Sequence, residues 1–521
     1  MKKSKCSLIP NPSPKEKGVH APLMKNLQNL WQKKITPYNH KLFLFTFLFC
    51  NTVFSQNIND FVTELKKETE LQNASIGLCV MDAQTGVTIC EHNGKLSLTP
   101  ASTLKIITTS TALQLLGKDF RYETLLQYTG TFNKTNGILN GDLVIKGSGD
   151  PSLNSEYFRK PEDTFFVANK WTAILKEKGI KKITGQIVLD ISCFEEDIPG
   201  TWVWGDLGNY FGAAPHGLSY NDNKFYIVFK PVSKVGDSVC VNNTVPCLGG
   251  LCFNNSVKAG GTEDNATVYR APFSNEVTIH GTLPVSAKSQ SIEASLPDPS
   301  LLLAKHLQMA FAEQGIELKN LETLKITAHN KKQYDKPRTT LYSYKSPTLE
   351  KIIFFTNLHS NNMYAESIFK TMALKKGGWG STFQGMTTVT THLKSKGFDI
   401  NGLFINDGSG VSRSNAVTAE HLTKILYMMA VDSINKAAFT NSLPIAGVSG
   451  SLRNLGKGTA LENNFRAKSG YITRARSYAG YMKTKSGKEI CLSLIINNFN
   501  GTPAETKKKM EQIFLKVYEL F

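Results

Sequence analysis

Ser102 and Lys105 are the first residues of this chain whose types and spacing could do chemistry. They stand three residues apart in P-A-S-T-L-K, where an apolar run begins that reads as a helix as far as Leu116. On a helix this spacing places both side chains on one face. A serine hydroxyl is a weak nucleophile, and a neighbouring amine accepts its proton only if burial or nearby cations lower the pKa of the amine. The pair is therefore a candidate nucleophile and base, although most S-x-x-K tetrapeptides are a helix cap followed by a solvated lysine.

Two later strings strengthen this interpretation. Ser360-Asn361-Asn362 and Lys468-Ser469-Gly470 follow in the order S-x-x-K, S-x-N, K-[ST]-G, which is typical of penicillin-binding proteins and class A β-lactamases. Taken singly, the second string reads as a plain turn and the third as an exposed strand lysine. Asparagine stands at the middle of the second string where aspartate is usual, and serine replaces threonine in the third, but the required hydroxyl, amide and amine groups are kept.

Four further strings extend the pattern over the chain from about residue 57 to the C-terminus. With them the sequence resembles the D-alanyl-D-alanine carboxypeptidase/endopeptidase family, peptidase family S13 of the penicillin-binding protein 4 type. The resemblance implies a serine acyl-transfer enzyme that acts on peptidoglycan stem peptides, is trapped covalently by β-lactam antibiotics and uses no cofactor or metal. The strings are G-S-G-D-P (147–151), W-V-W-G-D-L-G-N-Y-F-G-A (202–213), D-G-S-G-V-S-R (407–413) and G-V-S-G-S-L (447–452).

The same resemblance assigns catalytic roles. Ser102 would attack the carbonyl between two D-alanines, and Lys105 would be the base, kept neutral for part of the time by the ammonium of Lys468. Ser360 would relay the proton to the leaving amine, while Asn362 would hydrogen-bond the substrate amide. These five residues form the predicted catalytic set.

The resemblance also predicts how the two ends of the substrate are held. Lys468 and Ser469 would bind the terminal carboxylate in the string that ends at Gly470. The oxyanion needs preorganised backbone donors, which the family places at the nucleophile and just after this string, here Ser102 and Tyr471. Threonine is usual at the latter position, so only the backbone N–H of Tyr471 carries over.

Asp206 and Arg413 would bind the charged end of a diaminopimelate side chain. That end carries one ammonium and one carboxylate, so a carboxylate and a guanidinium complement it. A surface salt bridge, or an arginine that stabilises its own loop, is the alternative. The aromatic residues of the 202–213 string, Trp202 among them, are more typical of a core than of a site.

Residues 1–55 read as a secretory signal peptide. Lysines precede an apolar run at residues 42–49, and a small-residue pattern leads to a cleavage site before Gln56. Extended to Phe54, the run is about 13 residues, fewer than the roughly 20 that a membrane-spanning helix needs. We therefore expect export to the periplasm or cell envelope, with Met24 as an alternative translation start.

The chain has a formal net charge of +18, and nine lysines against one glutamate in the first 55 residues leave +10 on the rest. A basic exported protein is drawn to anionic wall polymers and to the membrane surface as a peripheral partner, but a merely soluble positive surface explains the charge equally well. No long basic run with interleaved aromatic residues occurs, so nucleic acid is not an expected partner.

Seven cysteines lie beyond Ser55, and an odd number leaves at least one thiol unpaired within the chain. Cys240, Cys247 and Cys252 are close in sequence, which favours one local disulfide, and no histidine stands beside them at zinc-ligand spacing. Cys79 and Cys90 would face each other across a hairpin around the turn A-Q-T-G. Their expected Cβ separation is a little wide for a relaxed disulfide, so thiols are favoured over a bridge.

The domain prediction follows from length. About 466 residues remain after the signal peptide, more than one core usually holds, and 254 residues separate Lys105 from Ser360. We predict an α+β catalytic domain of the β-lactamase/DD-peptidase type, an antiparallel sheet flanked by helices, with large β-rich insertions. The expected parts are 1–55 (signal peptide), 56–120 (first catalytic part), 121–337 (insertions) and 338–521 (second catalytic part, resuming with a strand at 341–344).

Three rival functions stay open at this stage. A serine β-lactamase shares the three motifs but needs a fast deacylation base and has no use for so large an insertion. A non-catalytic penicillin sensor or wall-binding protein has no need of all three motifs. A Ser-His-Asp hydrolase is disfavoured because no G-x-S-x-G string is present.

Overall fold

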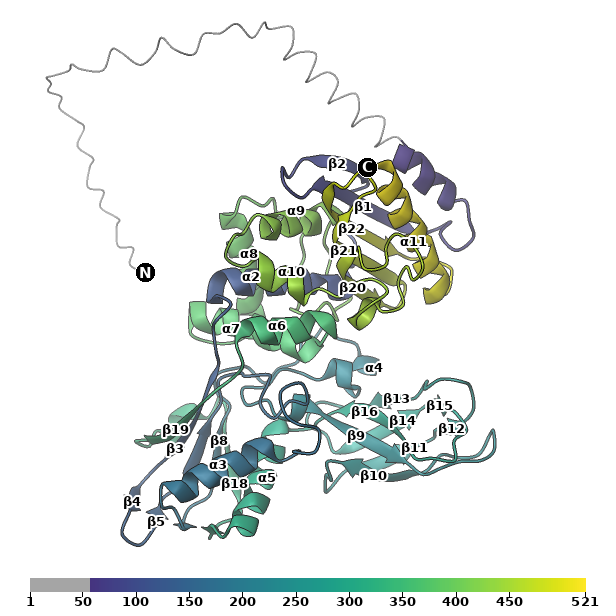
Figure 1. Cartoon of the computed structure of the whole chain (residues 1–521). Helices are drawn as coiled ribbons and strands as arrows, with labels where there is room; N and C mark the ends of the chain where they lie inside the picture. The colour runs from purple at the N-terminus through teal and green to yellow at the C-terminus, as the bar shows by residue number, and fades with distance from the viewer. Residues whose placement is uncertain (1–56) are drawn as a thin grey trace, which may run out of the picture. The chain divides into compact units, whose positions relative to one another are not determined.

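The motif-bearing part of the chain is built on a five-stranded antiparallel sheet with the order β2-β1-β22-β21-β20 (Figure 1). The structure, a computed structural model, describes residues 57–521, so the expected signal peptide and the alternative start at Met24 lie outside it. Within residues 57–521 no helix is long and apolar enough to cross a bilayer. The strands are β1 (Ser75–Asp82), β2 (Thr88–His92), β20 (Arg466–Ile472), β21 (Ala475–Lys483) and β22 (Glu489–Asn497).

Both faces of this sheet are buried. Side chains alternate along a strand, and Cys491 and Ile495 of β22 face one core while Leu492 and Leu494 face another. The second core is closed by α11 (Pro503–Leu520) and by a helix at residues 57–65. Helices α9 and α11 cover opposite sides of the sheet (Figure 1). Because both faces of the sheet are therefore buried, β22 is a nearly continuous apolar strand.

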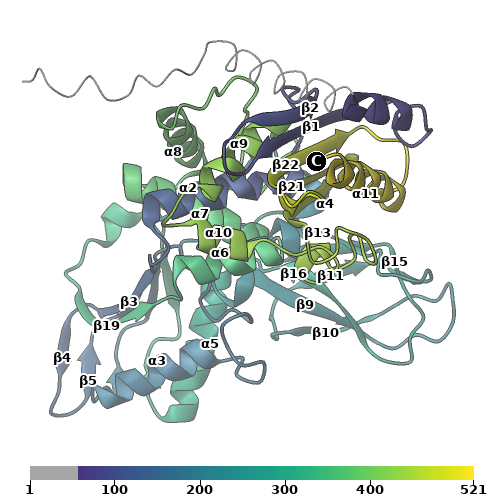
Figure 2. The same cartoon turned by 45° about the horizontal axis from the view of Figure 1, so that its top comes forward.

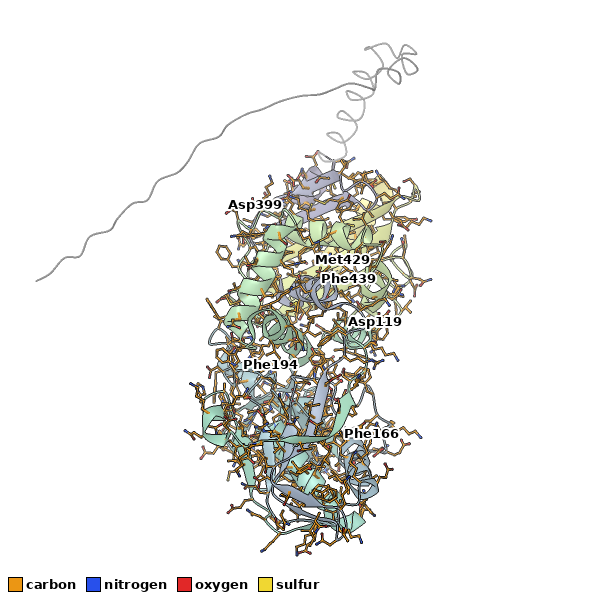
Figure 3. All side chains as sticks on the ribbon, turned by 90° about the vertical axis from the view of Figure 1, so that its left-hand side faces the viewer. Asp119, Phe166, Phe194, Asp399, Met429 and Phe439 are labelled. Atoms are coloured by element: carbon orange, nitrogen blue, oxygen red, sulfur yellow. The ribbon has the colours of Figure 1, made fainter. Side chains whose placement is uncertain are left out.

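The first core contains the helix that follows Ser102. This helix, α2, lies between α7 and α9 in both views (Figures 1 and 2) and is buried along almost its whole length. Its apolar residues point in every direction, as expected for a helix surrounded by others. Met429 of α9 and Phe439 of α10 are labelled in this helical layer in Figure 3. The helices are α2 (Lys105–Leu116), α6 (Leu349–Leu358), α7 (Asn362–Gly377), α8 (Thr382–Ser395), α9 (Ala419–Ala430) and α10 (Lys436–Ser442).

A large β-rich region interrupts the helical layer between α2 and α6. Its first half is a mixed five-stranded sheet, β18-β8-β6-β3-β19, with a smaller sheet, β17-β7-β5-β4. β6, β8 and β18 run parallel, and the crossovers between them contain α3 (Phe166–Glu177) and α5 (Pro299–Gln314). The strands are β3 (Glu123–Tyr128), β4 (Thr131–Asn133), β5 (Ile138–Asn140), β6 (Leu143–Lys146), β7 (Lys182–Ile183), β8 (Ile187–Asp190), β17 (Glu317–Leu318), β18 (Thr323–Ile326) and β19 (Thr339–Lys345).

The second half of this region consists of three small sheets, β10-β9-β16, β11-β14-β13 and β12-β15. One hydrophobic core runs through both halves, from Leu126 to Tyr344. The strands are β9 (Lys224–Phe229), β10 (Val241–Val245), β11 (Cys252–Asn255), β12 (Lys258–Ala259), β13 (Thr267–Tyr269), β14 (Glu276–His280), β15 (Thr282–Leu283) and β16 (Gln290–Ser295).

The predicted α+β class is confirmed, as is the hairpin around the turn A-Q-T-G. Residues 184–186 separate β7 from β8, which belong to different sheets. The predicted catalytic strand at 341–344 has a different partner. It forms β19, which pairs with β3 in the inserted sheet, because an alternating pattern marks a strand without naming its neighbour.

The chain leaves and re-enters the helical layer at adjacent points. The Tyr122 N–H donates to Ser346 Oγ at 2.9 Å, and the Ser346 N–H donates to the Tyr122 carbonyl at 3.0 Å. Phe194 provides a further junction. It is buried against Gly149 of the G-S-G-D-P string and Gly380, where a Cβ would lie within 2.4 Å of its ring. The close contact with the Phe194 ring therefore explains why glycine stands at position 149 of that string.

Two predictions about cysteines are corrected. A β-bulge between Val80 and Met81 shifts the hairpin register by one residue, so Cys90 pairs with Val80 and Cys79 with Glu91. The two sulfurs consequently lie in different cores on opposite faces of the sheet, as free thiols. The favoured thiol state is confirmed, but the facing geometry is wrong.

The local disulfide among Cys240, Cys247 and Cys252 is also wrong, since all three are free and exposed. Cys240 and Cys247 lie beyond opposite ends of β10, and Cys252 begins β11 in a different sheet. Each strand residue adds about 3.3 Å, so closeness in sequence does not bring these sulfurs together.

Candidate active site

Ser102 lies on a short 3-10 helix (Ala101–Leu104) that continues directly into α2, with Lys105 as the first α-helical residue. Lys105 Nζ is 3.0 Å from Ser102 Oγ. It also donates to Asn362 Oδ1 and to the Ser409 carbonyl, each at 2.6 Å. Ala101, immediately before the serine, has a φ of +48°, a left-handed conformation that is strained for a non-glycine residue and is often found at functional sites. The predicted pair is thus held at hydrogen-bonding distance by tertiary contacts as well as by helical spacing.

Lys105 is completely buried, and this burial lowers the pKa of its amine to about 7. The carboxyl groups of Asp407 and Glu366 oppose the shift. The expected cause was repulsion by Lys468, but it is the removal of the Lys105 amine from water that lowers its pKa. The pKa of Lys468 is itself lowered well below its usual value, first by burial and then by the charge of Lys105. A proton acceptor is therefore available beside Ser102 near neutral pH.

Ser360 lies in the connection between α6 and α7 with a φ of +57°. Lys468 Nζ donates to Ser360 Oγ at 2.9 Å and to the Ser469 carbonyl at 2.7 Å. Asn361 is the N-cap of α7, and its side chain accepts from the Tyr364 N–H at 3.0 Å. Asparagine caps a helix as well as aspartate does, so this departure from the usual motif keeps its structural role.

Asn362 links the candidate base Lys105 to the region between α2 and α6. Its Oδ1 accepts from Lys105, and its Nδ2 donates to the Phe211 carbonyl at 2.7 Å. Phe211 belongs to the 202–213 string. The amide orientation is thereby fixed, with one of its two N–H groups occupied by the inserted region.

The third motif lies on β20, and its neighbours include a residue that sequence reasoning missed. Ser469 Oγ donates to Ser451 Oγ at 2.7 Å. Ser451 follows Gly450, which has a φ of +52° and packs so closely on the end of α6 that a Cβ would lie 2.3 Å from the Leu358 carbonyl oxygen. The G-V-S-G-S-L string signalled this loop, but nothing in it indicated that Ser451 would contact the third motif.

Gly470 allows β20 to touch the turn that carries Ser102. A Cβ at Gly470 would lie 2.6 Å from the Pro100 carbonyl oxygen and 2.9 Å from the Ser102 nitrogen. Ser477, opposite Gly470 on β21, donates its hydroxyl to the same Pro100 carbonyl. Tyr471 follows on β20, half-exposed, with the Arg476 guanidinium 5.4 Å from its ring centroid. The two backbone segments predicted to supply the oxyanion donors are therefore adjacent.

Asp206 and Arg413 meet although 207 positions separate them. Arg413 Nη1 donates to Asp206 Oδ2 at 2.9 Å, with the arginine side chain 38% and the aspartate side chain 17% exposed. Asp206 lies on α4 (Trp204–Leu207) in the inserted region, and Arg413 ends the loop at 407–413.

Six of the predicted site residues line one cavity of about 640 Å³, whereas Lys105, Lys468, Ser469 and Gly470 are not among its lining residues; the six are Ser102, Ser360, Asn362, Tyr471, Asp206 and Arg413. Motif residues form one wall, with Ser102, Ser360 and Asn362, and the Asp206–Arg413 pair lies in the same cavity. A cavity of similar volume near the start of α5 contains none of the motif residues. The remaining lining residues from the inserted region are Glu156, Tyr157, Tyr210, Phe211, Asp222, Lys224 and Glu293.

Glu366 is a second residue that sequence reasoning missed. It is fully buried on α7, and both carboxylate oxygens accept from the Gly408 N–H, at 2.9 and 3.0 Å. Burial, followed by repulsion from Asp407, raises the pKa of Glu366. Its position four residues after Asn362 was a usable signal, because that spacing places both residues on one helix face.

Comparison with known proteins supports the resemblance seen in the motifs. A family model described as "D-Ala-D-Ala carboxypeptidase 3 (S13) family" matches residues 57–517. The D-alanyl-D-alanine carboxypeptidase DacB of Haemophilus influenzae is 26% identical over 461 residues, covering 87% of this chain and 90% of that protein. The D-alanyl-D-alanine carboxypeptidase of Actinomadura sp. strain R39 is 25% identical, covering 84% and 82% of the two chains.

Among solved structures, penicillin binding protein 4 (dacB) from Haemophilus influenzae has a TM-score of 0.73 at 24% identity, covering 88% of this chain and 98% of that one. This likeness extends over nearly all of the described fold, the β-rich region between α2 and α6 included. The family match likewise takes in the catalytic motifs, the intervening β-rich region and the last helix. Because it extends over residues 57–517 rather than over the motifs alone, the chain belongs to the S13 family of D-Ala-D-Ala carboxypeptidases.

Proposed function

We propose that this protein is a serine-type D-Ala-D-Ala peptidase that cleaves peptidoglycan stem peptides through an acyl-enzyme. The observation that carries the proposal is the 3.0 Å contact between Ser102 Oγ and the buried Lys105 amine, in a cavity that Ser360, Asn362 and Tyr471 also line. The names of the relatives, which are D-alanyl-D-alanine carboxypeptidases, support the same reaction.

In the acylation step the neutral Lys105 amine takes the proton of Ser102 as the hydroxyl oxygen bonds to the scissile carbonyl carbon. The carbonyl oxygen becomes an oxyanion between the N–H groups of Ser102 and Tyr471. The C–N bond then breaks, and the leaving amine needs a proton. Ser360 Oγ, which accepts from Lys468 Nζ at 2.9 Å, relays a proton from Lys468 to that amine, so Lys468 loses one proton while Lys105 keeps the proton taken from Ser102.

The remaining motif residues orient the substrate. Lys468 and Ser469 bind the terminal carboxylate, and the free N–H of the Asn362 amide binds the substrate amide. Gly470 keeps β20 close enough for both oxyanion donors to reach one oxygen. Water or an amine later attacks the acyl-enzyme carbonyl and gives up a proton, which returns to Lys468 through Ser360, and the Ser102 oxygen leaves with the proton held by Lys105, which regenerates the hydroxyl.

Penicillin tests this proposal and separates it from a β-lactamase. We expect one equivalent of fluorescent penicillin to remain bound per protein, and nitrocefin to be consumed in a stoichiometric burst. Sustained nitrocefin turnover would indicate a β-lactamase, and the absence of any covalent adduct would indicate a non-catalytic protein. Mass spectrometry of muropeptides before and after incubation identifies whether the terminal D-alanine is trimmed, cross-links are cut, or both occur.

We further propose that Asp206 and Arg413 recognise the charged end of a diaminopimelate side chain. In the present structure the two side chains satisfy each other at the cavity wall. An amino acid end group offers an ammonium to the aspartate and a carboxylate to the arginine, so it can replace their mutual contact with two charge-assisted contacts.

The substitution Arg413→Ala should lower kcat/KM for diaminopimelate-containing peptides by roughly 10- to 1,000-fold, as expected for a lost hydrogen bond between charged groups. Peptides with an uncharged side chain and simple thioesters should be far less affected. A matched control is Lys488→Ala, which breaks the ion pair to Asp82 on the β1–β2 hairpin and should leave selectivity unchanged. Equal losses on both substrate types would assign Arg413 to loop support.

The domain organisation and location are proposed on the same basis. Residues 56–120 and 338–521 form the catalytic domain and residues 121–337 the insertions, with the pairing of β19 and β3 favouring a second boundary near Ser346. Residues 1–55 direct export to the periplasm or cell envelope, where peptidoglycan is the partner and the basic surface contacts wall polymers or membrane peripherally.

A further inference from the structure

Asp407, the first residue of the loop 407–413, is a completely buried carboxylate whose four hydrogen-bonding positions are all filled by donors. Oδ1 accepts from the Gly410 N–H at 2.8 Å and from Asn415 Nδ2 at 2.7 Å. Oδ2 accepts from the Ser412 N–H at 2.6 Å and from Trp202 Nε1 at 2.9 Å. Among these donors the indole of Trp202 is the one that comes from the inserted region.

The loop that Asp407 organises touches each part of the reaction site. The Ser409 carbonyl receives the Lys105 amine at 2.6 Å. Gly410, with a φ of +87°, approaches the nucleophile so closely that a Cβ would lie 1.9 Å from the Ala101 carbonyl oxygen. Arg413 then reaches Asp206. One buried carboxylate therefore holds in place two parts of the loop. One part contacts the base, and the other carries the arginine proposed to recognise the substrate.

Trp202 stands four residues before Asp206, and the intervening chain is a tight turn in which the Asp206 N–H donates to the Val203 carbonyl at 2.9 Å. Trp202 is almost fully buried, whereas Arg413 is 38% exposed. An exposed ion pair contributes little to holding two segments together, while a buried hydrogen bond to a carboxylate contributes more. The indole–carboxylate bond is thus the stronger link between the segment of Asp206 and the loop of Arg413.

We propose that Trp202 and Asp407 are positioning residues for substrate selection, and that their hydrogen bond sets the Asp206–Arg413 pair at the correct distance from Ser102. This inference rests on the proposed function and goes beyond it. The bond belongs to the specificity apparatus of the enzyme, and the inserted region acts on selection through a residue that never contacts the substrate.

The test compares Trp202→Phe with Trp202→His. Both replace the two-ring indole with a single smaller ring, but only histidine keeps a ring N–H. The two variants therefore share the loss of packing and differ in the hydrogen-bond donor. Trp202→Phe should lower kcat/KM for a diaminopimelate-containing pentapeptide by roughly 10- to 100-fold, the range for losing a hydrogen bond to a charged group. Acylation by penicillin should change by less than about threefold, and Trp202→His should recover part of the selectivity. Trp204→Phe, at an exposed position of the same string, is the control expected to change neither.

A double-mutant cycle identifies the route of the effect. If Trp202 acts through the Asp206–Arg413 pair, Trp202→Phe should add nothing in an Arg413→Ala background. Additive losses, or an equal loss of penicillin acylation in Trp202→Phe, would overturn the proposal. Loss of the thermal unfolding transition in both Trp202 variants would also overturn it, because Trp202 would then be a core residue.

The same measurements distinguish a failure of this inference from a failure of the proposed function. Absence of penicillin acylation in the unsubstituted protein would remove the peptidase proposal. Normal acylation and a selective loss in Arg413→Ala, combined with unchanged selectivity in Trp202→Phe, would leave the peptidase and its arginine in place and reject only the positioning role.

Discussion

Replacing Ser102 with alanine is expected to abolish covalent labelling of the protein by fluorescent penicillin. The Ser102 oxygen is the atom that would form the acyl bond, and Lys105 Nζ lies 3.0 Å from it. Peptide hydrolysis should fall by roughly 10⁴- to 10⁶-fold, as when a serine hydrolase loses its nucleophile. The measurement is in-gel fluorescence combined with intact-protein mass after exposure to penicillin.

Ser110→Ala is the matched control for this variant. Ser110 is a buried serine of α2, the helix that follows Ser102, and its hydroxyl donates to the Ile107 carbonyl within the helix. The control should label normally, and both variants should show a cooperative thermal transition. Undiminished labelling of Ser102→Ala would show that another serine of the cavity is the nucleophile, and Ser360 would be the first to test.

Replacing Lys105 with methionine is expected to slow acylation by roughly 10²- to 10⁴-fold, the usual contribution of a positioned general base. Methionine keeps much of the buried apolar volume, so the loss should come from chemistry rather than from packing. Lys105→Arg provides the discriminating comparison. Arginine retains a cation but stays protonated, so it should not restore the rate if Lys105 accepts the Ser102 proton. Recovery with arginine would mean that Lys105 serves only as a fixed positive charge.

The pH profile gives a second readout of the same role. Burial lowers the pKa of Lys105 to about 7, and only the neutral amine, present above that pKa, can accept a proton. Acylation by penicillin should therefore rise as the pH is raised towards about 7 and level off above it. The groups that share this environment are Lys468, Asp407 and Glu366. A profile without a rise in the neutral range would contradict the assignment of the base.

The predicted site residues came from short strings, because each string encodes a local chemical requirement. S-x-x-K gives two residues of one helix, and K-S-G gives an amine and a hydroxyl on one strand. The order of the motifs, which matches that of a known family, indicated that these residues form one site. No spacing rule states that Lys105 and Asn362, separated by 257 positions, meet at 2.6 Å.

Helix α7 is an element that the hydrophobic periodicity of the sequence did not predict. Its residues from Met363 to Ala373 are buried without interruption, because α2, α6 and α8 surround it. A helix buried on all sides shows no polar stripe, so no amphipathic pattern indicated it. Glu366 was overlooked with it, although its position four residues after Asn362 follows at once when the helix is known.

The contact between Trp202 and Asp407 could not be predicted for a different reason. Each residue was noticed within its own string, one as an aromatic core residue and the other as the start of a polar loop. Their hydrogen bond joins positions 205 apart, one in the β-rich region between α2 and α6 and one in the loop before α9. Local propensity carries no information about such a distance, and the same limit applies to β19, whose strand character was predicted but whose pairing with β3 was not.

The strand order of the sheet that carries the motifs also bears on the order in which the site is assembled during folding. β1 pairs directly with β22, with Ser75 opposite Asn497, so strands from opposite ends of the described chain are neighbours. Such long-range pairing is slow to form, because a very large loop must close before any contact rewards it. Ser102 is synthesised early, whereas β20, which carries Lys468, is joined to β1 in this sheet through β21 and β22. We therefore expect the groups around Ser102 to be assembled only once residues 489–497 are available to pair.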